Sequence, residues 1–200
     1  MWDLENEEIE NMTKQQKSCL KESSEWQIRR LSAHDAAVFR EVRLRALAEE
    51  PLAFGSSAEE QSKYPLDFFA KRLMPPDSAE SGMFGAFDQQ GILVGTLGFN
   101  RETGLKRRHI AAITAVYVVP ECRGLGCAAK LLDTAIAHAR TLQGLRQVQL
   151  AVSVPMVAAR KLYHTRGFES YGLERAALCV NGSFIDEDHL VLFLHPTPVT

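Results

Sequence analysis

The feature that most constrains this chain is a strand that turns through glycines directly into a helix. Residues 110–119 are β-branched and small apolar types, which predict a buried strand. Pro120 ends that strand because it has no N–H to donate. Two glycines and then apolar residues at helical spacing follow, namely Gly124, Gly126, Ala128, Leu131, Leu132 and Ala135. The sequence therefore predicts a strand, a tight turn and a helix as one unit.

A turn of this kind is suited to binding an anion. The first N–H groups of a helix have no partner within the helix, and the positive end of the helix dipole lies there. Glycine at positions 124 and 126 permits a positive φ and the close approach of a ligand to the backbone. We therefore predict that this turn binds a phosphate group.

Two families of phosphate-binding proteins use this arrangement. Residues 124–129 match the dinucleotide fingerprint G-x-G-x-x-G/A. That fingerprint requires an acidic residue about 20 positions later, at the end of the next strand, to hold the ribose. The next predicted strand, residues 147–152, has no acid at its end. The dinucleotide hypothesis therefore fails its own test.

The second family fits better. Residues 123–128, Arg-x-x-Gly-x-Ala after the strand, resemble motif A (Q/R-x-x-G-x-G/A) of the GNAT superfamily of N-acetyltransferases. Residues 159–168, Ala-x-x-Leu-Tyr-x-x-x-Gly-Phe, resemble the second signature of that family. The two motifs come in the family's order, with one predicted strand between them. The resemblance covers about residues 26–196 and implies a GNAT domain over that range.

The resemblance implies an α/β fold with a central mixed sheet of about seven strands and helices on both faces. The predicted elements follow the order expected of that fold. Strands are predicted at 26–31, 83–87, 92–99, 110–119, 147–152, 176–180 and 183–194. Helices are predicted at 32–50, 57–73 and 155–164, and a further helix contains the apolar positions from Ala128 to Ala135. Ser32 and Ser57 are the predicted N-caps of the first two helices. Asn181-Gly182 predicts a hairpin between the last two strands, and residues 75–78 predict a turn.

The resemblance further implies a site for acetyl-CoA as co-substrate. In the family the pantetheine arm pairs with the central strand, and an N–H near Val118 would stabilise the developing charge on the thioester oxygen. Tyr163 matches the tyrosine that protonates the departing thiolate. The residues expected to contact the cofactor are Val116, Tyr117, Val118, Arg123, Gly124, Leu125, Gly126, Cys127, Ala128 and Ala129.

Two positions depart from the family pattern. Met156 stands where relatives often have asparagine, and Thr114 stands where some relatives have a glutamate as general base. A base must therefore come from elsewhere, act through water, or be unnecessary if the amine arrives neutral. The candidates, taken from the loops that usually face the acceptor in the family, are Glu59, Glu60, Glu102, His109 and Asp186. The acceptor pocket is expected between residues 54–60 and 181–188, whose aromatic and acidic side chains suit a small cationic amine.

Three functions agree with these features. The first is acetyl transfer to a primary amine of a small molecule, by direct attack in a ternary complex, by a monomer or homodimer. The second is acetylation of a protein N-terminus or lysine, which would require an open groove in place of a closed pocket. The third is a non-catalytic module that binds acyl-CoA without turnover.

Composition narrows the partners and the compartment. A net charge of −2 over 200 residues gives no electrostatic reason for binding nucleic acid or an anionic membrane. No apolar run approaches the roughly 18–20 residues of a spanning helix. Four cysteines and six histidines lack metal-ligand spacing, so no metal site is predicted. The expected compartment is the reducing cytoplasm.

The first 25 residues differ from the rest of the chain. They are rich in charge and poor in apolar side chains, so they bury little surface on folding. We predict that residues 1–25 form a charged extension, disordered or loosely helical, and that residues 26–196 form the single folded domain.

Overall fold

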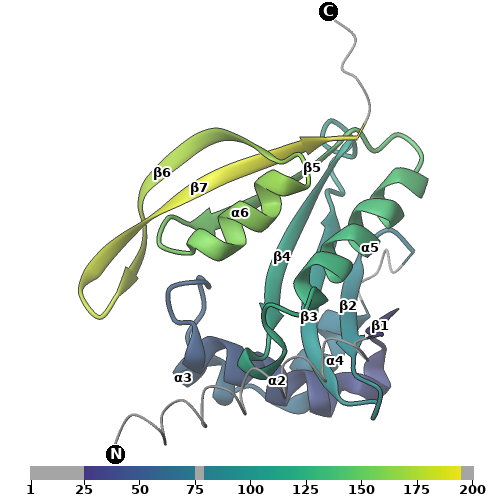
Figure 1. Cartoon of the computed structure of the whole chain (residues 1–200), viewed down its shortest axis with the longest axis vertical. Coiled ribbons are helices and arrows are strands. Elements are labelled where there is room, and N and C mark those ends of the chain that lie inside the picture. The colour runs from purple at the N-terminus through teal and green to yellow at the C-terminus, as the bar shows by residue number, and fades with distance from the viewer. Residues whose placement is uncertain (1–24, 75–78, 195–200) are drawn as a thin grey trace, which may run out of the picture.

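The computed structural model describes residues 25–74 and 79–194, and within them it forms a seven-stranded sheet with helices on both faces (Figure 1). The strands are β1 (Gln27–Arg30), β2 (Gly82–Phe87), β3 (Leu93–Arg101), β4 (Ile110–Val118), β5 (Gln147–Ser153), β6 (Glu169–Val180) and β7 (Ser183–Phe193). The helices are η1 (Ala33–Asp35), α2 (Ala36–Glu49), α3 (Ala58–Ser62), α4 (Leu66–Leu73), η2 (Pro120–Cys122), α5 (Cys127–Thr141) and α6 (Val157–Thr165).

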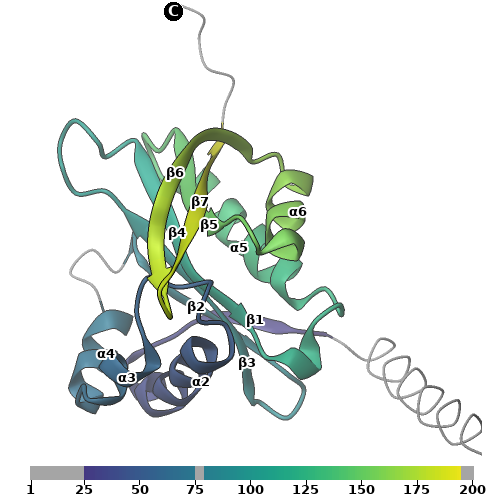
Figure 2. The ribbon, with the colours of Figure 1, turned by 90° about the vertical axis from the view of Figure 1, so that its left-hand side faces the viewer.

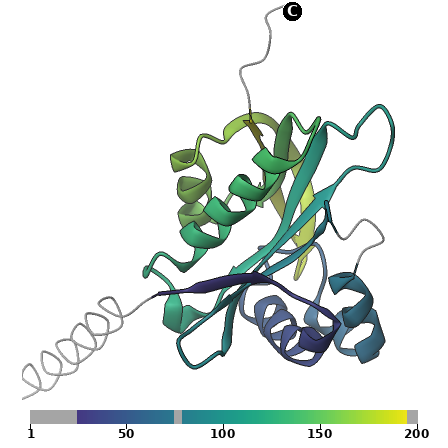
Figure 3. The same ribbon diagram turned by 90° about the vertical axis from the view of Figure 1, so that its right-hand side faces the viewer.

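The sheet is mixed, as the sequence predicts. Its strand order is β1-β2-β3-β4-β5-β7-β6. The neighbours from β1 to β4 are antiparallel, β4 and β5 are parallel, and β7 is antiparallel to both β5 and β6. Helices α2, α3 and α4 lie on one face of the sheet, and α5 and α6 lie on the other (Figures 2 and 3). The predicted fold is confirmed.

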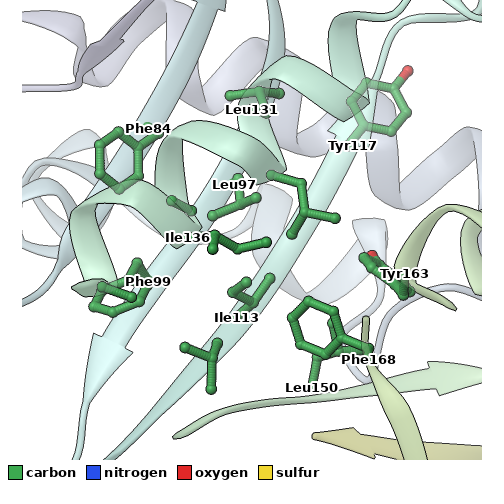
Figure 4. Close-up of a cluster of buried hydrophobic side chains, with 14 of the residues drawn as sticks. Phe84, Leu97, Phe99, Ile113, Tyr117, Leu131, Ile136, Leu150, Tyr163 and Phe168 are labelled. Atoms are coloured by element: carbon green, nitrogen blue, oxygen red, sulfur yellow. The ribbon is translucent and has the colours of Figure 1, made fainter. Parts of the chain in front are cut away.

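The main core lies between α5 and the central strands (Figure 4). The apolar positions at helical spacing in α5, Leu131, Leu132 and Ala135, are fully buried. They pack with side chains such as Leu97 and Phe99 from β3. This burial fixes α5 against the sheet and so fixes the glycine turn that precedes it.

Strands β4 and β5 pair over only part of their length. The register joins Ile110–Ala112 to Gln147–Gln149 and then stops, although both strands continue. On its other edge β4 has a bulge, where Ala115 has a φ of 51° and the register with β3 shifts. Residues 113–118 therefore have no β5 partner, and the sheet is split open at this place.

Two predicted elements differ from the structure. The helix expected at 57–73 is two helices, α3 and α4, because Pro65 lacks an N–H and disfavours helical geometry at the residue before it. The Ser57 cap is confirmed, since its Oγ accepts the Glu60 N–H at 3.1 Å. Strand β6 begins at Glu169, earlier than the predicted 176, because its register shifts hide the alternation.

Some predictions fall outside what the structure describes. The turn at 75–78 and the charged extension, apart from Glu25, lie outside the described residues. The division into an extension and a domain spanning 26–196 stays a prediction. None of the described helices combines the length and the apolar character needed to cross a membrane.

Candidate active site

A cavity of about 430 Å³ lies along the open edge of β4, between the start of α5 and one face of α6. Its lining includes Val116, Tyr117, Val118, Arg123, Gly124, Gly126, Cys127, Ala128, Ala129 and Tyr163. The structure thus brings together every site residue predicted from the sequence except Leu125. Sequence reasoning missed Glu50 and Ala53, which also line the cavity.

The glycine turn forms the end of this cavity. Gly124 and Gly126 have φ values of 76° and 84°, which an L side chain rarely adopts. A Cβ at either glycine would meet no atom within 4 Å, so the space above the turn is open. Gly126 is the N-cap of α5 and has no side chain to cap the first helical N–H groups, which leaves those of residues 127–129 available to an anion.

The glycine turn is held in place by a hydrogen bond from Trp26, the residue before β1. The carbonyl oxygen of Leu125 accepts a hydrogen bond from Nε1 of Trp26 at 3.2 Å, and the Trp26 ring is buried in the main core. Leu125 therefore faces the protein with its carbonyl while its glycine neighbours face the cavity. This contact joins residues 99 positions apart, which explains why spacing alone could not separate Leu125 from the lining residues.

The end of β4 presents backbone groups to the cavity. The N–H of Val119 donates to the carbonyl of Val94 on β3 at 2.9 Å. Because successive N–H groups of an extended strand point to opposite edges, the N–H of Val118 points away from β3, to the open side. The Val118 carbonyl points the same way and accepts a hydrogen bond from Nε of Arg123 at 2.9 Å.

Arg123 lies at the rim and is held by an acid. Its Nη1 is 2.6 Å from Oε1 of Glu50, the residue after the end of α2. The guanidinium also lies over the ring of Tyr117, 5.6 Å from its centroid. Tyr117 in turn donates a hydrogen bond to Glu49, and its burial together with this carboxylate raises the pKa of its phenol. These contacts connect the end of α2 to the glycine turn.

Tyr163 reaches the cavity from α6 (Figure 4). The helix ends at Thr165, and Gly167 just beyond it has a φ of 84°, which lets the chain reverse so that the Phe168 N–H donates to the Tyr163 carbonyl at 3.2 Å. Phe168 then packs edge-on against the Tyr163 ring, with centroids 5.9 Å apart. The second signature is therefore a helix cap that orients this tyrosine. Burial raises the pKa of Tyr163 to about 12, so its hydroxyl is a neutral donor at neutral pH.

An ion pair between a partly exposed arginine and a buried aspartate fixes α6 on the sheet. Nη2 of Arg160, one turn before Tyr163, is 2.9 Å from Oδ2 of Asp188 on β7. Asp188 is buried and also accepts a hydrogen bond from the hydroxyl of Ser170 on β6. These contacts anchor the helix that carries Tyr163.

A second, smaller cavity of about 90 Å³ adjoins the first at Tyr163. It lies between residues 113–116 of β4 and 150–153 of β5, where the two strands have separated. Ala53 and Phe54 close one side. The loop that carries them is fixed at Leu52, whose carbonyl accepts the Ser153 hydroxyl at 2.5 Å.

None of the five loop residues predicted as candidate general bases lines either cavity. Glu59 pairs with Lys63, and Glu60 accepts the hydroxyl of Tyr64. Glu102 pairs with Arg107 in the loop before β4, at the opposite end of that strand from the glycine turn. The remaining two, His109 and Asp186, use backbone or carboxylate oxygens to hold neighbouring backbone N–H groups.

Comparison with known proteins identifies a matching family and solved structures of similar fold. The model of the acetyltransferase (GNAT) family matches residues 43–168. No curated protein sequence matched the chain. Among solved structures, a GNAT-family acetyltransferase from Streptococcus pneumoniae is 23% identical with a TM-score of 0.70, covering 84% of this chain and 99% of its own.

Two further structures of similar fold have named acceptors. A phosphinothricin acetyltransferase from Sinorhizobium meliloti, in complex with acetyl-CoA, is 20% identical with a TM-score of 0.71, covering 88% of this chain and 91% of its own. A ribosomal-protein-alanine N-acetyltransferase from Brucella melitensis is 20% identical with a TM-score of 0.72, covering 84% and 99%. At these identities the matches show a shared fold.

Proposed function

This chain belongs to the GNAT acetyltransferase family, and we propose that it transfers the acetyl group of acetyl-CoA to a primary amine of a small molecule. Family membership makes it an acetyltransferase with acetyl-CoA as its co-substrate. The acceptor and the roles of individual residues belong to the proposal.

The cavity fits the cofactor by its chemistry. The N–H groups at the start of α5 would hold the pyrophosphate, and Arg123 would add a positive charge beside it. The backbone of Val116, which has no β5 partner, would pair with an amide of the pantetheine arm, as a further strand would. This arm would bring the thioester to Tyr163, where the two cavities meet.

The proposed reaction is direct attack by the neutral amine on the thioester carbonyl. The N–H of Val118 would donate to the carbonyl oxygen as negative charge develops on it. As the C–S bond breaks, the hydroxyl of Tyr163 would give its proton to the thiolate, and the amine nitrogen would release a proton to solvent. Solvent would then return a proton to the Tyr163 phenolate. No carboxylate of the described chain lines the smaller cavity, so an amine that arrives neutral suits this site.

The observation that supports a small acceptor is the small size of the cavity in which the acceptor would bind. The cavity beyond Tyr163 is small and lies between strands, and Ala53 and Phe54 of the loop after α2 line it. A methyl group added at Gly55 would lie 3.7 Å from Leu178 on β6, so this loop lies close to the long hairpin. An acceptor that is part of a folded protein would need an open groove at this place.

The test is release of free thiol from acetyl-CoA with a panel of small primary amines and with peptides bearing a free N-terminus or lysine. We expect turnover with small amines. Turnover with peptides alone would replace the proposal with protein acetylation. Binding of acetyl-CoA without turnover on either panel would indicate the non-catalytic module.

We expect Glu50→Gln to tighten binding of CoA. Glu50 now shares Arg123 with any bound phosphate and adds a negative charge to the cavity. The pair is partly exposed, and such pairs are worth about 0.2–1 kcal/mol, so the gain in affinity should be at most about fivefold. Calorimetric titration at low and high salt checks this, with Glu59→Gln as the control. Weaker binding would mean that Glu50 positions Arg123 for the cofactor.

A further inference from the structure

Three arginines on α2 and α4 have no carboxylate partner among the described residues. They are Arg40, Arg43 and Arg72. Arg43 is the most enclosed of the three, with 6% of its surface exposed. Its Nε donates to Oε1 of Gln61 at 3.2 Å, but its Nη1 is buried and has no hydrogen-bond partner. This nitrogen is a buried charged donor with its hydrogen-bonding capacity unused.

Such a group is costly to keep. A buried guanidinium without a counter-charge loses hydration that nothing replaces. Burial, together with the nearby charge of Arg72, lowers the pKa of Arg43 to about 10. Arg43 is nevertheless charged at neutral pH. A positive charge held in this way is explained when a ligand supplies the missing anion.

Arg43 adjoins the acceptor side of the active site. The Cζ atom of Arg43 lies 4.7 Å from the centroid of the Phe54 ring. Phe54 lines both cavities, including the small one beyond Tyr163. One aromatic ring therefore separates the guanidinium from the place where the acceptor amine would meet the thioester. That ring belongs to the loop between α2 and α3, not to a helix.

The acids that suggested a purely cationic acceptor lie elsewhere. Glu59 and Glu60 are exposed and are bonded to Lys63 and Tyr64. The lining of the small cavity contains no charged side chain. The charged group stacked on this wall, through Phe54, is the guanidinium of Arg43, which is positive.

We propose that the amine acceptor also carries a carboxylate, which Arg43 binds with Arg72 as a second positive charge. The inference rests on the proposed function and narrows its substrate class to amino acids and related amino-carboxylates. A guanidinium offers two parallel N–H donors that match a carboxylate. Binding requires the Phe54 ring to turn aside, so that the carboxylate takes its place against Arg43.

The first experiment compares acceptors in matched pairs that differ in the carboxylate. The pairs are phenylalanine and phenethylamine, leucine and isoamylamine, and lysine and cadaverine. Hydrogen bonds to charged groups are worth about 1.5–3 kcal/mol, so kcat/KM should favour the amino acid by roughly 10- to 150-fold. Equal kcat/KM within the pairs, or preference for the amines, would overturn the proposal.

The second experiment tests whether the preference for amino acids over the matching amines depends on Arg43 and Arg72. Arg43→Gln should raise the KM of the amino acid and bring the ratio within each pair close to one, with unchanged affinity for CoA. Arg72→Gln should reduce the ratio by a smaller factor. Arg108→Gln, which removes a half-exposed guanidinium paired with Glu80 at the far end of the sheet, should leave the ratio unchanged. A preference that survives Arg43→Gln contradicts the assignment.

Binding of the acetylated products tests the carboxylate site independently of turnover, and so separates this inference from the proposed function. In the presence of CoA, N-acetylphenylalanine should bind the wild-type protein, and Arg43→Gln should weaken it at least about tenfold. N-acetylphenethylamine should bind both proteins equally. Absence of turnover with every amine would reject the proposed function, whereas binding of N-acetylphenylalanine that does not depend on Arg43 would reject only the carboxylate site. A melting temperature of each variant confirms that it is folded.

Discussion

A Gly126→Trp variant should fold and should no longer bind acetyl-CoA. Gly126 lies at the N-cap of α5 with its Cβ direction open, so the indole would enter the space that the pyrophosphate needs. The φ of 84° adds strain of about 1–2 kcal/mol, which a domain of this size tolerates. Affinity for CoA should fall below detection in a calorimetric titration. Thermal stabilisation by CoA, about 2.7 kcal/mol at 100 times the Kd in the wild type, should vanish.

The control for backbone strain is Gly91→Trp. Gly91 has a φ of 78° and equally open surroundings, but it lies in the turn between β2 and β3 and does not line the cofactor cavity. It should lose a similar amount of stability and keep full affinity for CoA. If folded Gly126→Trp binds CoA as the wild type does, the glycine turn is not the pyrophosphate site.

Tyr163→Phe should lower kcat and kcat/KM together and leave the affinity for CoA unchanged. The proton that the hydroxyl gives to the thiolate is transferred only in the transition state, so the loss appears in the chemical step. General-acid assistance is typically worth about 10²–10⁴-fold. The lower end is expected here, because a thiolate is a good leaving group that water can also protonate. Single-turnover rates on the true acceptor check this.

The pH dependence of the rate gives a second test of the role of Tyr163. Burial raises the pKa of Tyr163 to about 12, which means that the protonated, donating form persists until the pH rises through that value. The phenol should therefore add no limb to the pH–rate profile below about pH 11. Tyr163→Phe should lower the whole profile without changing its shape. Tyr171→Phe, an exposed tyrosine on β6, is the control, and wild-type kcat in Tyr163→Phe would make Tyr163 a packing residue only.

Much of the fold and cofactor side was predictable because it depends on local sequence. The strand, glycine turn and helix at residues 110–132 are contiguous, and each glycine marks a backbone conformation that only glycine adopts readily. The same holds for Asn181-Gly182, where both residues have positive φ. The second signature was equally local, since Gly167 caps the helix that carries Tyr163.

The acceptor side was not predictable, because it is built from contacts between distant segments. Arg43 looks like any polar residue on a helix until its stacking on Phe54 and its burial are seen. The Trp26 contact that holds Leu125 spans most of the domain. Bulges in β6 removed the alternation by which a strand is recognised. Sequence patterns report local geometry, whereas these features arise from packing.

The separation of β4 from β5 has a consequence for the enzyme's response to its surroundings. The backbone at Val116, left without a β5 partner, would pair with the pantetheine arm, and that arm is identical in acetyl-CoA and in the CoA that remains after transfer. Interactions common to substrate and product bind both equally and do not speed the chemical step. CoA should therefore compete strongly with acetyl-CoA and leave slowly. The rate of acetylation would then follow the ratio of acetyl-CoA to CoA, so that the enzyme responds to the acetylation state of the cofactor pool.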